Sequence, residues 1–450
     1  MTEYGAIDLD KIYSERKYFL KNSIKIEPDD EEQEYLPKDR YKLVYFIILL
    51  HGIGTLIPWN MFISIAPQYF IDFKLQPANS SKPEYAVNFF SYLGVCSQFP
   101  NLVVNFLNLF IVVKDGLAPR IVLALFVLLA SCMVTLIFVF IDTSYYTFGY
   151  FLITMLSVII LNSANGIYQN SMFGIIADFP PQYINASIMG MNFCGIFIAV
   201  LLIITTLGAN DVQWSAFYYF LIALLVVVFC IVSFFILQKL RFYRYYTKKA
   251  QRLREIEEDK QHEQISWKIY LALLKEDWLH FFNIFLVFFV TLAIFPAVVS
   301  ETPLYPGRAD FFIPNDLYVI IAVFLNFNVF ATIGNFIANY IQWPSPKYLW
   351  TLTFPRLLFI PIFLYCNFGG DLRNTNFPVF IQNEWNFIIL LSLLSISHGY
   401  LSSLAMMYAP KAVHPSKAQA AGMMSGVVLL LGIFLGNVFT LIESHMFKVI

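Results

Sequence analysis

The chain has 450 residues, of which 58% are hydrophobic and only 13% charged, and its formal net charge is −1. With a mean hydropathy of +0.65, it lacks the polar surface that a soluble fold of this length needs. This composition excludes a soluble enzyme, a disordered chain and a nucleic-acid partner, and it predicts a polytopic membrane protein. The five cysteines stand singly in apolar runs, so we expect neither a disulfide framework, a metal site nor a cofactor.

Eleven stretches are apolar and long enough to cross a bilayer as helices, and Arg356 is the only charge inside them. In chain order they cover residues 43–71, 86–113, 121–141, 143–177, 179–210, 212–238, 278–300, 317–346, 348–370, 385–410 and 418–442. We therefore predict an all-α polytopic membrane protein with eleven transmembrane helices. Its expected parts are a cytosolic tail (1–42), helices one to six (43–239), a cytosolic linker (240–277) and helices seven to eleven (278–450).

The distribution of Lys and Arg predicts the orientation of these spans. We place the N-terminus in the cytosol and the C-terminus outside the cell. With this orientation, 23 of the 29 basic residues lie on the cytosolic side and five on the extracellular side, and the remaining one, Arg356, lies within a span. Asn79 begins an Asn-Ser-Ser glycosylation acceptor in the first outside loop, whereas the acceptor at Asn185 falls inside. The linker begins basic and aromatic, which indicates a solvated helix or loop or, alternatively, a regulatory or lipid-contacting segment.

Neutral polar residues recur at helical spacing inside five of the predicted spans. These stripes comprise His51, Thr55 and Trp59; Gln98, Asn101, Asn105 and Asn108; Asn162, Asn165 and Gln169; Asn328, Thr332, Asn335 and Asn339; and Ser395, His398 and Ser402. Such side chains either join helices by hydrogen bonds or line a shared polar pathway, and five stripes favour the pathway. A lining of amides and hydroxyls suits a neutral solute. An aromatic side chain such as Trp59 can stack on a flat ring of that solute.

Carboxylates stand only at the rims of the predicted spans, which argues against an ion-coupled pump. Arg356 and three histidines (His51, His280 and His398) are the ionisable exceptions within the spans. Arg356 either snorkels to the inner interface or has a gating or packing partner. Pro58, Pro100 and Pro296 are among the residues that bend spans, as transporters tolerate where backbone lines a cavity.

Several of these segments resemble the equilibrative nucleoside transporter family. The resemblance begins with His-Gly-Ile-Gly-Thr-Leu-Ile-Pro-Trp-Asn at 51–60, which is similar to the signature of the family's first helix. Further similar blocks follow at 162–174, 240–246, 295–298, 356–361, 366–367, 399–404, 409–411 and 420–422. The resemblance implies a major-facilitator-like arrangement of six helices against five, with sodium-independent, facilitated movement of nucleosides by alternating access.

Site residues follow from the resemblance by position. Leu56, Trp59 and Ile63 are expected to face a central substrate site from the first span. Gln169 matches a glutamine expected to read the edge of a base, and Gln98 stands where the family has an apolar contact. Gly190 and Gly195 match structural glycines of the fifth span, and Arg356 and His398 are expected to be structural or gating residues.

The eighth span departs from the family pattern. Members usually carry an Asp and, four residues later, an Arg that hold the sugar hydroxyls; here Ala331 and Asn335 occupy these places. His398 also replaces the Asn that usually precedes the glycine of the tenth span. Either neutral groups such as Asn328, Asn335 and Gln98 replace the charged pair, or the substrate differs.

The sequence therefore predicts a multi-pass plasma-membrane carrier of nucleosides or nucleobases that contacts the bilayer and works without a cofactor. A divergent carrier of another organic solute, such as an amine, is the alternative within transport. An intramembrane enzyme is a remote alternative, because the spans lack a metal-ligand motif and a paired carboxylate.

Overall fold

The computed structural model describes residues 37–77, 83–87, 89–111, 116–208, 211–261, 267–304, 311–370 and 378–447. Within these ranges every regular element is a helix, which confirms the predicted all-α class. The predicted glycosylation site at Asn79 and most of the predicted cytosolic tail lie outside the described residues.

The first half of the chain forms six long helices in the order predicted from hydropathy. They are α2 (Leu43–Ile63), α4 (Phe89–Leu107), α5 (Ala118–Phe138), α6 (Thr147–Ala177), α7 (Pro181–Gly208) and α8 (Val212–Lys239). Three shorter pieces flank the first two, namely a 3-10 turn (Arg40–Lys42), a π-helical segment (Ala66–Lys74) and α3 (Glu84–Val87). The predicted span at 43–71 is therefore interrupted after Ile63.

The predicted linker is helical, with α9 (Arg241–Gln261) followed by α10 (Trp267–Glu276). The second half contains α11 (Trp278–Ile294), α12 (Ala297–Ser300), α13 (Asn315–Tyr318), a π-helical segment (Val319–Leu325), α14 (Asn326–Tyr340), α17 (Glu384–Ala412) and α18 (Ala418–Phe447). Between α14 and α17, three short pieces follow one another: α15 (Trp350–Thr353), a 3-10 segment (Phe354–Leu358) and α16 (Phe359–Leu364).

Nine helical stretches in the described ranges are long and apolar enough to cross a membrane. The two predicted spans outside this set are α4, whose Gln98, Asn101 and Asn105 lower its hydropathy, and the segment from α15 to α16. In the latter, Pro355 and Pro361 each remove a backbone donor, so the segment forms short pieces instead of one helix. The count of eleven transmembrane helices stays a prediction.

Polar residues mark the ends of several helices. Asp39 accepts hydrogen bonds from the backbone N–H groups of Val44 and Tyr45, which fixes the start of α2. Asn383 caps α17 in the same way through Trp385 N–H at 2.9 Å. Between their ends, the helices turn large apolar side chains outward, and Leu123 and Leu441 are 67% and 69% exposed. Such outer faces suit a hydrocarbon surrounding.

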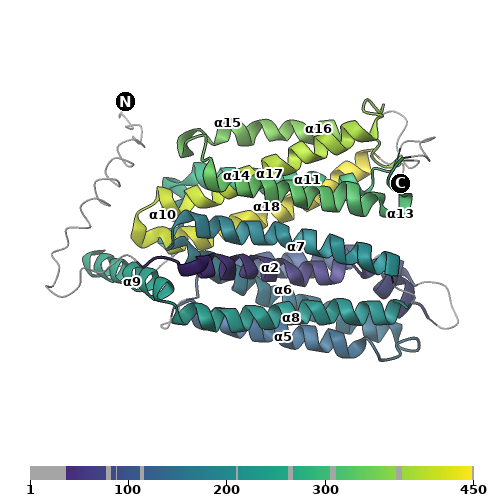
Figure 1. The fold of residues 1–450 in the computed structure, drawn as a ribbon, viewed down its shortest axis with the longest axis horizontal. Helices are drawn as coiled ribbons and strands as arrows, with labels where there is room; N and C mark the ends of the chain where they lie inside the picture. The colour runs from purple at the N-terminus through teal and green to yellow at the C-terminus, as the bar shows by residue number, and fades with distance from the viewer. Residues whose placement is uncertain are drawn as a thin grey trace.

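The helices pack as two groups that meet along α7 (Figure 1). In the first group α2 packs on α7 and α4 on α6; in the second, α14 packs on α17 and α11 on α18. The groups meet where α7 contacts α14 and α17, and where α6 contacts α18. Figure 1 shows α9 projecting at the end of the bundle where α2 begins. We refer to this end as the α2 end.

Candidate functional site

Helix α2 carries the three residues that the sequence places at the substrate site. Leu56, Trp59 and Ile63 are partly buried and pack against the main hydrophobic core. The helix is held to α6 by Asn165, whose side-chain N–H donates to the carbonyl of Thr55 at 2.9 Å. The Oδ1 atom of Asn165 has no hydrogen-bond partner among the described residues.

Gln169 lies on α6 between two residues whose side chains form hydrogen bonds within the protein. Tyr168 bonds to His51, and the Nδ2 of Asn170 donates to Asn105 Oδ1 and to the carbonyl of Met423, both at 2.8 Å. Gln169 is 4% exposed, yet no hydrogen bond joins its side chain to another described residue. The donor and acceptor groups of its side chain therefore have no partner within the described part of the chain.

His51 is a packing residue in this structure, although its stripe suggested a polar pathway. Its Nδ1 lies 2.6 Å from the hydroxyl of Tyr168, and its Nε2 lies 3.4 Å from that of Ser233. These contacts join α2 to α6 and α8, and the ring is fully buried. Both ring nitrogens are thus used within the protein.

A second polar network lies among α4, α5, α6 and α18. Asn108 donates to Asn170 Oδ1 at 2.9 Å, and Arg120 donates to Asn108 Oδ1 at 3.1 Å. Asn105 on α4 and Asn108 in the turn directly after it therefore serve to join helices. Gln98, one turn before Asn101 on the same helix, is half-buried and makes no hydrogen bond with another described residue.

The glycines of α7 permit close helix crossings on both sides. A methyl group added at Gly190 would overlap the carbonyl of Leu49 on α2, and one at Gly195 would overlap the side chain of Asn328 on α14. Gly195 and Asn328 therefore lie in direct contact across the boundary between the two groups of helices. Both glycines therefore allow an approach between helices that a larger side chain would prevent.

Helix α14 carries the residues that replace the charged pair. Asn328 donates to the carbonyl of Phe324, in the π-helical segment that leads into α14, at 2.8 Å. Asn335 is 0% exposed, and neither its Nδ2 nor its Oδ1 has a hydrogen-bond partner among the described residues. Its backbone carbonyl accepts from Asn185 of α7 at 2.8 Å. Ala331, fully buried, lies one turn away, where its carbonyl abuts Gly399 of α17.

Arg356 is buried within the second group of helices and does not reach an interface. Its guanidinium donates to the carbonyl of Val287 at 2.9 Å, to Thr291 Oγ1 at 2.8 Å and to Ser397 Oγ at 3.1 Å. Thr291 Oγ1 also lies 2.9 Å from Nδ1 of His398. Arg356 and His398 therefore belong to one hydrogen-bonded cluster that ties the broken ninth segment to α11 and α17.

A buried acid near the end of the last helix was not identified from the sequence. Glu443 is 3% exposed on α18, and neither carboxylate oxygen has a hydrogen-bond partner among the described residues. The predicted eleventh span ended at 442, but α18 continues to Phe447 and carries Glu443 into the packed region. A span predicted from hydropathy ends before the first charged residue. Hydropathy therefore could not predict that the helix continues and that Glu443 is buried.

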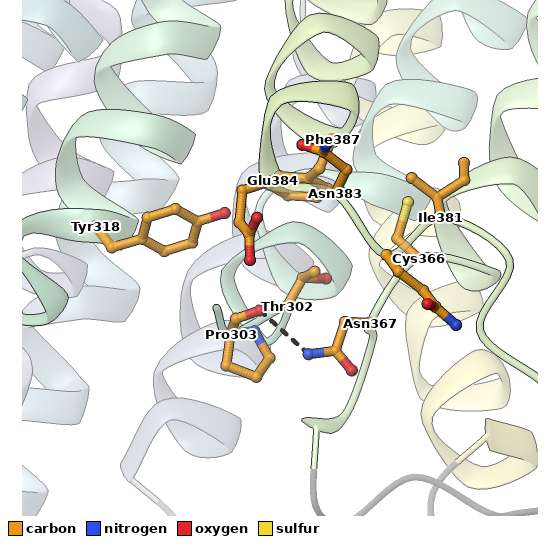
Figure 2. Close-up of a pocket in the computed structure, with 10 residues that line it drawn as sticks. Thr302, Pro303, Tyr318, Cys366, Asn367, Ile381, Asn383, Glu384 and Phe387 are labelled. Carbon is orange, nitrogen blue, oxygen red and sulfur yellow. Dashed lines mark hydrogen bonds between the residues drawn. The ribbon is translucent and has the colours of Figure 1, made fainter. Parts of the chain in front are cut away.

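A small pocket lies at the opposite end from the start of α2, where α12 ends and α17 begins (Figure 2). Glu384 and Tyr318 face one another across it, and Asn367 donates to the carbonyl of Pro303 at 3.3 Å. Its volume of about 10 Å³ is room for a single water molecule and excludes an organic solute. Among the described residues, no group of three or more His, Cys, Asp or Glu side chains is placed to hold a metal ion.

Comparison with known sequences identifies relatives along most of the chain. The sequence profile of the nucleoside transporter family matches residues 155–445. Equilibrative nucleoside transporter 1 of Homo sapiens is 30% identical over 458 aligned positions, covering 90% of this chain and 97% of that protein. Equilibrative nucleoside transporter 3 of Rattus norvegicus is 31% identical, covering 91% and 90%. Equilibrative nucleotide transporter 1 of Arabidopsis thaliana is 26% identical, covering 92% and 89%.

Solved structures show the same fold at low sequence identity. The proton:xylose symporter XylE superposes with a TM-score of 0.62 and 13% identity, over 91% of this chain and 90% of that one. The transporter FucP, in its outward conformation, gives a TM-score of 0.54 and 10% identity, over 90% and 95%. The fold is thus major-facilitator-like, and these relatives and structural neighbours are transporters, not enzymes. The chain belongs to the nucleoside transporter family.

Proposed function

We propose that this chain moves nucleosides, or their free bases, across a membrane by facilitated diffusion and alternating access. Gln169 carries the site assignment, because it is a buried amide on α6 whose hydrogen-bonding groups no described residue uses. Leu56, Trp59 and Ile63 supply apolar and aromatic surface on α2, on which a flat base can stack. Gln98, Asn328 and Asn335 supply further neutral amides.

The packing between α6 and α18 supports alternating access. A methyl group added at Gly422 would lie 2.5 Å from Cβ of Ala177, and one at Gly174 would lie 2.6 Å from Leu117 and 2.8 Å from Met423. The two groups of helices are therefore in close contact at the α2 end. We propose that this end is closed here and opens when the halves rock, parting α6 from α18.

The domain boundaries and the orientation are part of this proposal. The halves are residues 43–239 and 278–450, joined by a cytosolic linker at 240–277, with the N-terminus cytosolic in the plasma membrane. Asn185 is fully buried against α14, so its acceptor triplet should stay free of sugar, as an inside position requires. A glycosidase-sensitive mobility shift that disappears in Asn79→Gln would support this orientation. A shift lost only in Asn185→Gln would contradict it.

Uptake by the purified protein in lipid vesicles tests the substrate class. Radiolabelled uridine, its free base uracil and an organic amine should be compared at equal concentration. We expect saturable uridine uptake that is absent from protein-free vesicles and is lowered severalfold in Gln169→Ala. Uptake of the amine without uridine uptake would contradict the proposal.

An amine carrier is the second candidate, and Glu443 is the observation that favours it. A buried carboxylate without a hydrogen-bond partner can pair with an organic cation. The same assay separates the two candidates, because Glu443→Gln should abolish uptake of an amine while leaving uptake of a neutral nucleoside nearly unchanged.

A further inference from the structure

An apolar groove opens on the side of the bundle where α2 and α7 meet α14. Its volume is about 470 Å³. Its lining includes Phe46 and Leu49 from α2, Met189 and Phe193 from α7, and Ile333 and Phe336 from α14. We call this feature the lateral groove. Neither Gln169 nor Asn335 is among its lining residues, although Thr332 of the polar stripe on α14 is.

The lateral groove faces the bilayer. Its residues lie within helical stretches that can cross a membrane, and Phe46, Phe193 and Phe336 are 59%, 46% and 55% exposed. Hydrocarbon surrounds such positions in a membrane, so water is not a suitable occupant. A cavity of this size is within the range of sites that hold drug-sized apolar ligands.

The side chains that line the groove offer a polar ligand no free hydrogen-bond donor. Thr332 is its one polar side chain, and its hydroxyl donates to the carbonyl of Asn328 at 2.7 Å. Beside the lining residues Phe46 and Phe336, Asn339 of α14 donates to the hydroxyl of Tyr45 of α2 at 3.2 Å and joins the two halves. The lining, apolar apart from one hydroxyl oxygen, therefore suits a hydrocarbon chain better than a nucleoside.

Cations gather at the α2 end beside this groove. Lys38, Arg40 and Lys42 are exposed where α2 begins, and Lys42 directly precedes the first turn of α2, which carries Phe46. The carboxylate of Asp39, which lies between Lys38 and Arg40 in the sequence, accepts hydrogen bonds from Val44 N–H, Tyr45 N–H and the hydroxyl of Tyr183. The charge pattern of the sequence predicts that this end is cytosolic, and the cytosolic leaflet carries anionic lipids.

Exposed aromatic rings lie near these cations, as is typical of residues at a membrane interface. Tyr41, just before α2, is 83% exposed, and Tyr340, at the end of α14, is 72% exposed. Tyr and Trp side chains favour the headgroup region of a bilayer. A phosphate at this level would therefore lie beside Arg40 and Lys42 while an acyl chain of the same lipid reaches Phe46.

We propose that the lateral groove is a binding site for an acyl chain of an anionic phospholipid, whose headgroup is held by Arg40 and Lys42. Apolar walls, bilayer exposure and cations at one end together specify this class of ligand. A groove walled by α2 and α7 on one side and α14 on the other must change shape when the halves rock. A lipid bound there would therefore favour one conformation over the other, which links it to the proposed transport function.

Photolabelling tests this site without relying on transport. The full chain, reconstituted in phosphatidylcholine vesicles, is exposed to phosphatidylserine bearing a diazirine on one acyl chain, and the labelled residues are mapped by mass spectrometry. We expect label concentrated on Phe46, Met189, Ile333 and their neighbours. Ile333→Trp, which fills the groove, should lower this label at least fivefold. Leu123→Trp, which places the same ring on the lipid-facing side of α5, should leave it unchanged.

The headgroup is tested with a second probe and a charge variant. Phosphatidylcholine with the same diazirine chain should label the groove severalfold less than phosphatidylserine. The double variant Arg40→Gln with Lys42→Gln should remove this difference, whereas Lys239→Gln, an exposed cation at the end of α8, should preserve it. Thermal unfolding midpoints confirm that each variant is folded before labelling is compared.

Two results would overturn the proposal. One is label spread evenly over the lipid-facing residues or unchanged in a folded Ile333→Trp variant, and the other is equal labelling by the two lipids. Because neither measurement uses substrate, a failure here is distinct from a failure of the transport proposal, which the uridine assay reports.

Discussion

Asn335 is a buried amide that takes the place of a charge in the family pattern. An unpaired buried amide costs about 1–3 kcal/mol, and a ligand that completed its hydrogen bonds would recover part of this cost. The charged pair of the family would make bonds roughly twice as strong as a neutral amide does. We therefore expect weaker discrimination between a nucleoside and its base than in relatives that keep the pair.

Asn335→Ala separates a substrate contact from a packing role. The variant should lower uridine uptake by about 2- to 10-fold, the loss of one hydrogen bond, and lower uracil uptake less. Its unfolding midpoint should stay constant or rise, because the change removes an unpaired amide and keeps the backbone bond to Asn185. Asn339→Ala is the control, since it breaks the bond to Tyr45 and should lower the midpoint without changing the uridine-to-uracil ratio. Equal loss of both substrates in Asn335→Ala would contradict a sugar contact.

Gly190 gives a prediction about stability. Gly190→Ala should lower the unfolding free energy by about 1–3 kcal/mol, because the new methyl meets the backbone of α2 at Leu49 and the two helices must separate. Gly94→Ala on α4 is the matched control, since an added methyl there meets no heavy atom within 4 Å. Unfolding midpoints in one detergent compare the two variants, and an equal midpoint for both would rule out a tight crossing at Gly190.

Among single residues, the polar stripes could be predicted from the sequence but their partners could not. Spacing placed His51 on a polar face, yet its partner Tyr168 lies 117 residues away along the chain. Periodicity reports which face of a helix is polar and says nothing of which helix meets that face. For the same reason the burial of Arg356 against Val287 and Thr291 could not be separated in advance from snorkelling.

Helix α9 shows how the linker acts as an element. Its Arg254 forms an ion pair with Asp178, at the end of α6, with 3.1 Å between Nη1 and Oδ2. The same helix packs on the turn at Pro415–Lys417, which precedes α18. The linker thus touches both halves at the end that we propose to be closed. Burial raises the pKa of Asp178 to about 6, and Arg254 offsets part of that increase.

The unfolding midpoint should depend on pH through Asp178. An unfolded Asp has a pKa of about 3.9, so the folded protein binds the extra proton as pH falls through about 6. This group therefore contributes stability that is present at low pH and is lost as pH rises from about 4 to above 6. When the pH is lowered from 7.5 to 5, the unfolding midpoint of the wild type should therefore rise relative to that of Asp178→Asn.

Arg254→Gln tests the cause of this dependence. Because Arg254 lowers the pKa of Asp178, its removal should move the transition in the midpoint to higher pH. A wild-type profile parallel to that of Asp178→Asn at every pH would show that Asp178 does not titrate in this range.

The bounds of whole helices could be predicted from the sequence where the apolar runs are long and unbroken. The spans at 121–141 and 212–238 correspond closely to α5 (Ala118–Phe138) and α8 (Val212–Lys239). The breaks in the first, seventh, eighth and ninth spans were not located by hydropathy, because an apolar run stays apolar across a change in backbone geometry. Prolines gave a partial signal, as at Pro296, which separates α11 from α12.

At the scale of the whole molecule, two groups of helices surround residues whose polar groups are mostly neutral. The arrangement of the halves followed from a resemblance and not from hydropathy, since apolar runs do not encode which helices are neighbours. The boundary along α7 places Gly195 against Asn328, and close packing at Gly422 joins α18 to α6. These contacts are the ones that rocking of the halves must change.

We expect the solute gradient alone to drive transport. Glu443 is the one buried acid on α18 that could carry a proton, so the claim needs a direct test. Radiolabelled uridine should be followed into vesicles containing the purified protein, with sodium and proton gradients imposed or abolished. We predict that internal uridine rises to the external concentration and stops there under every condition. Accumulation above that level, collapsing when either gradient is dissipated, would contradict the account.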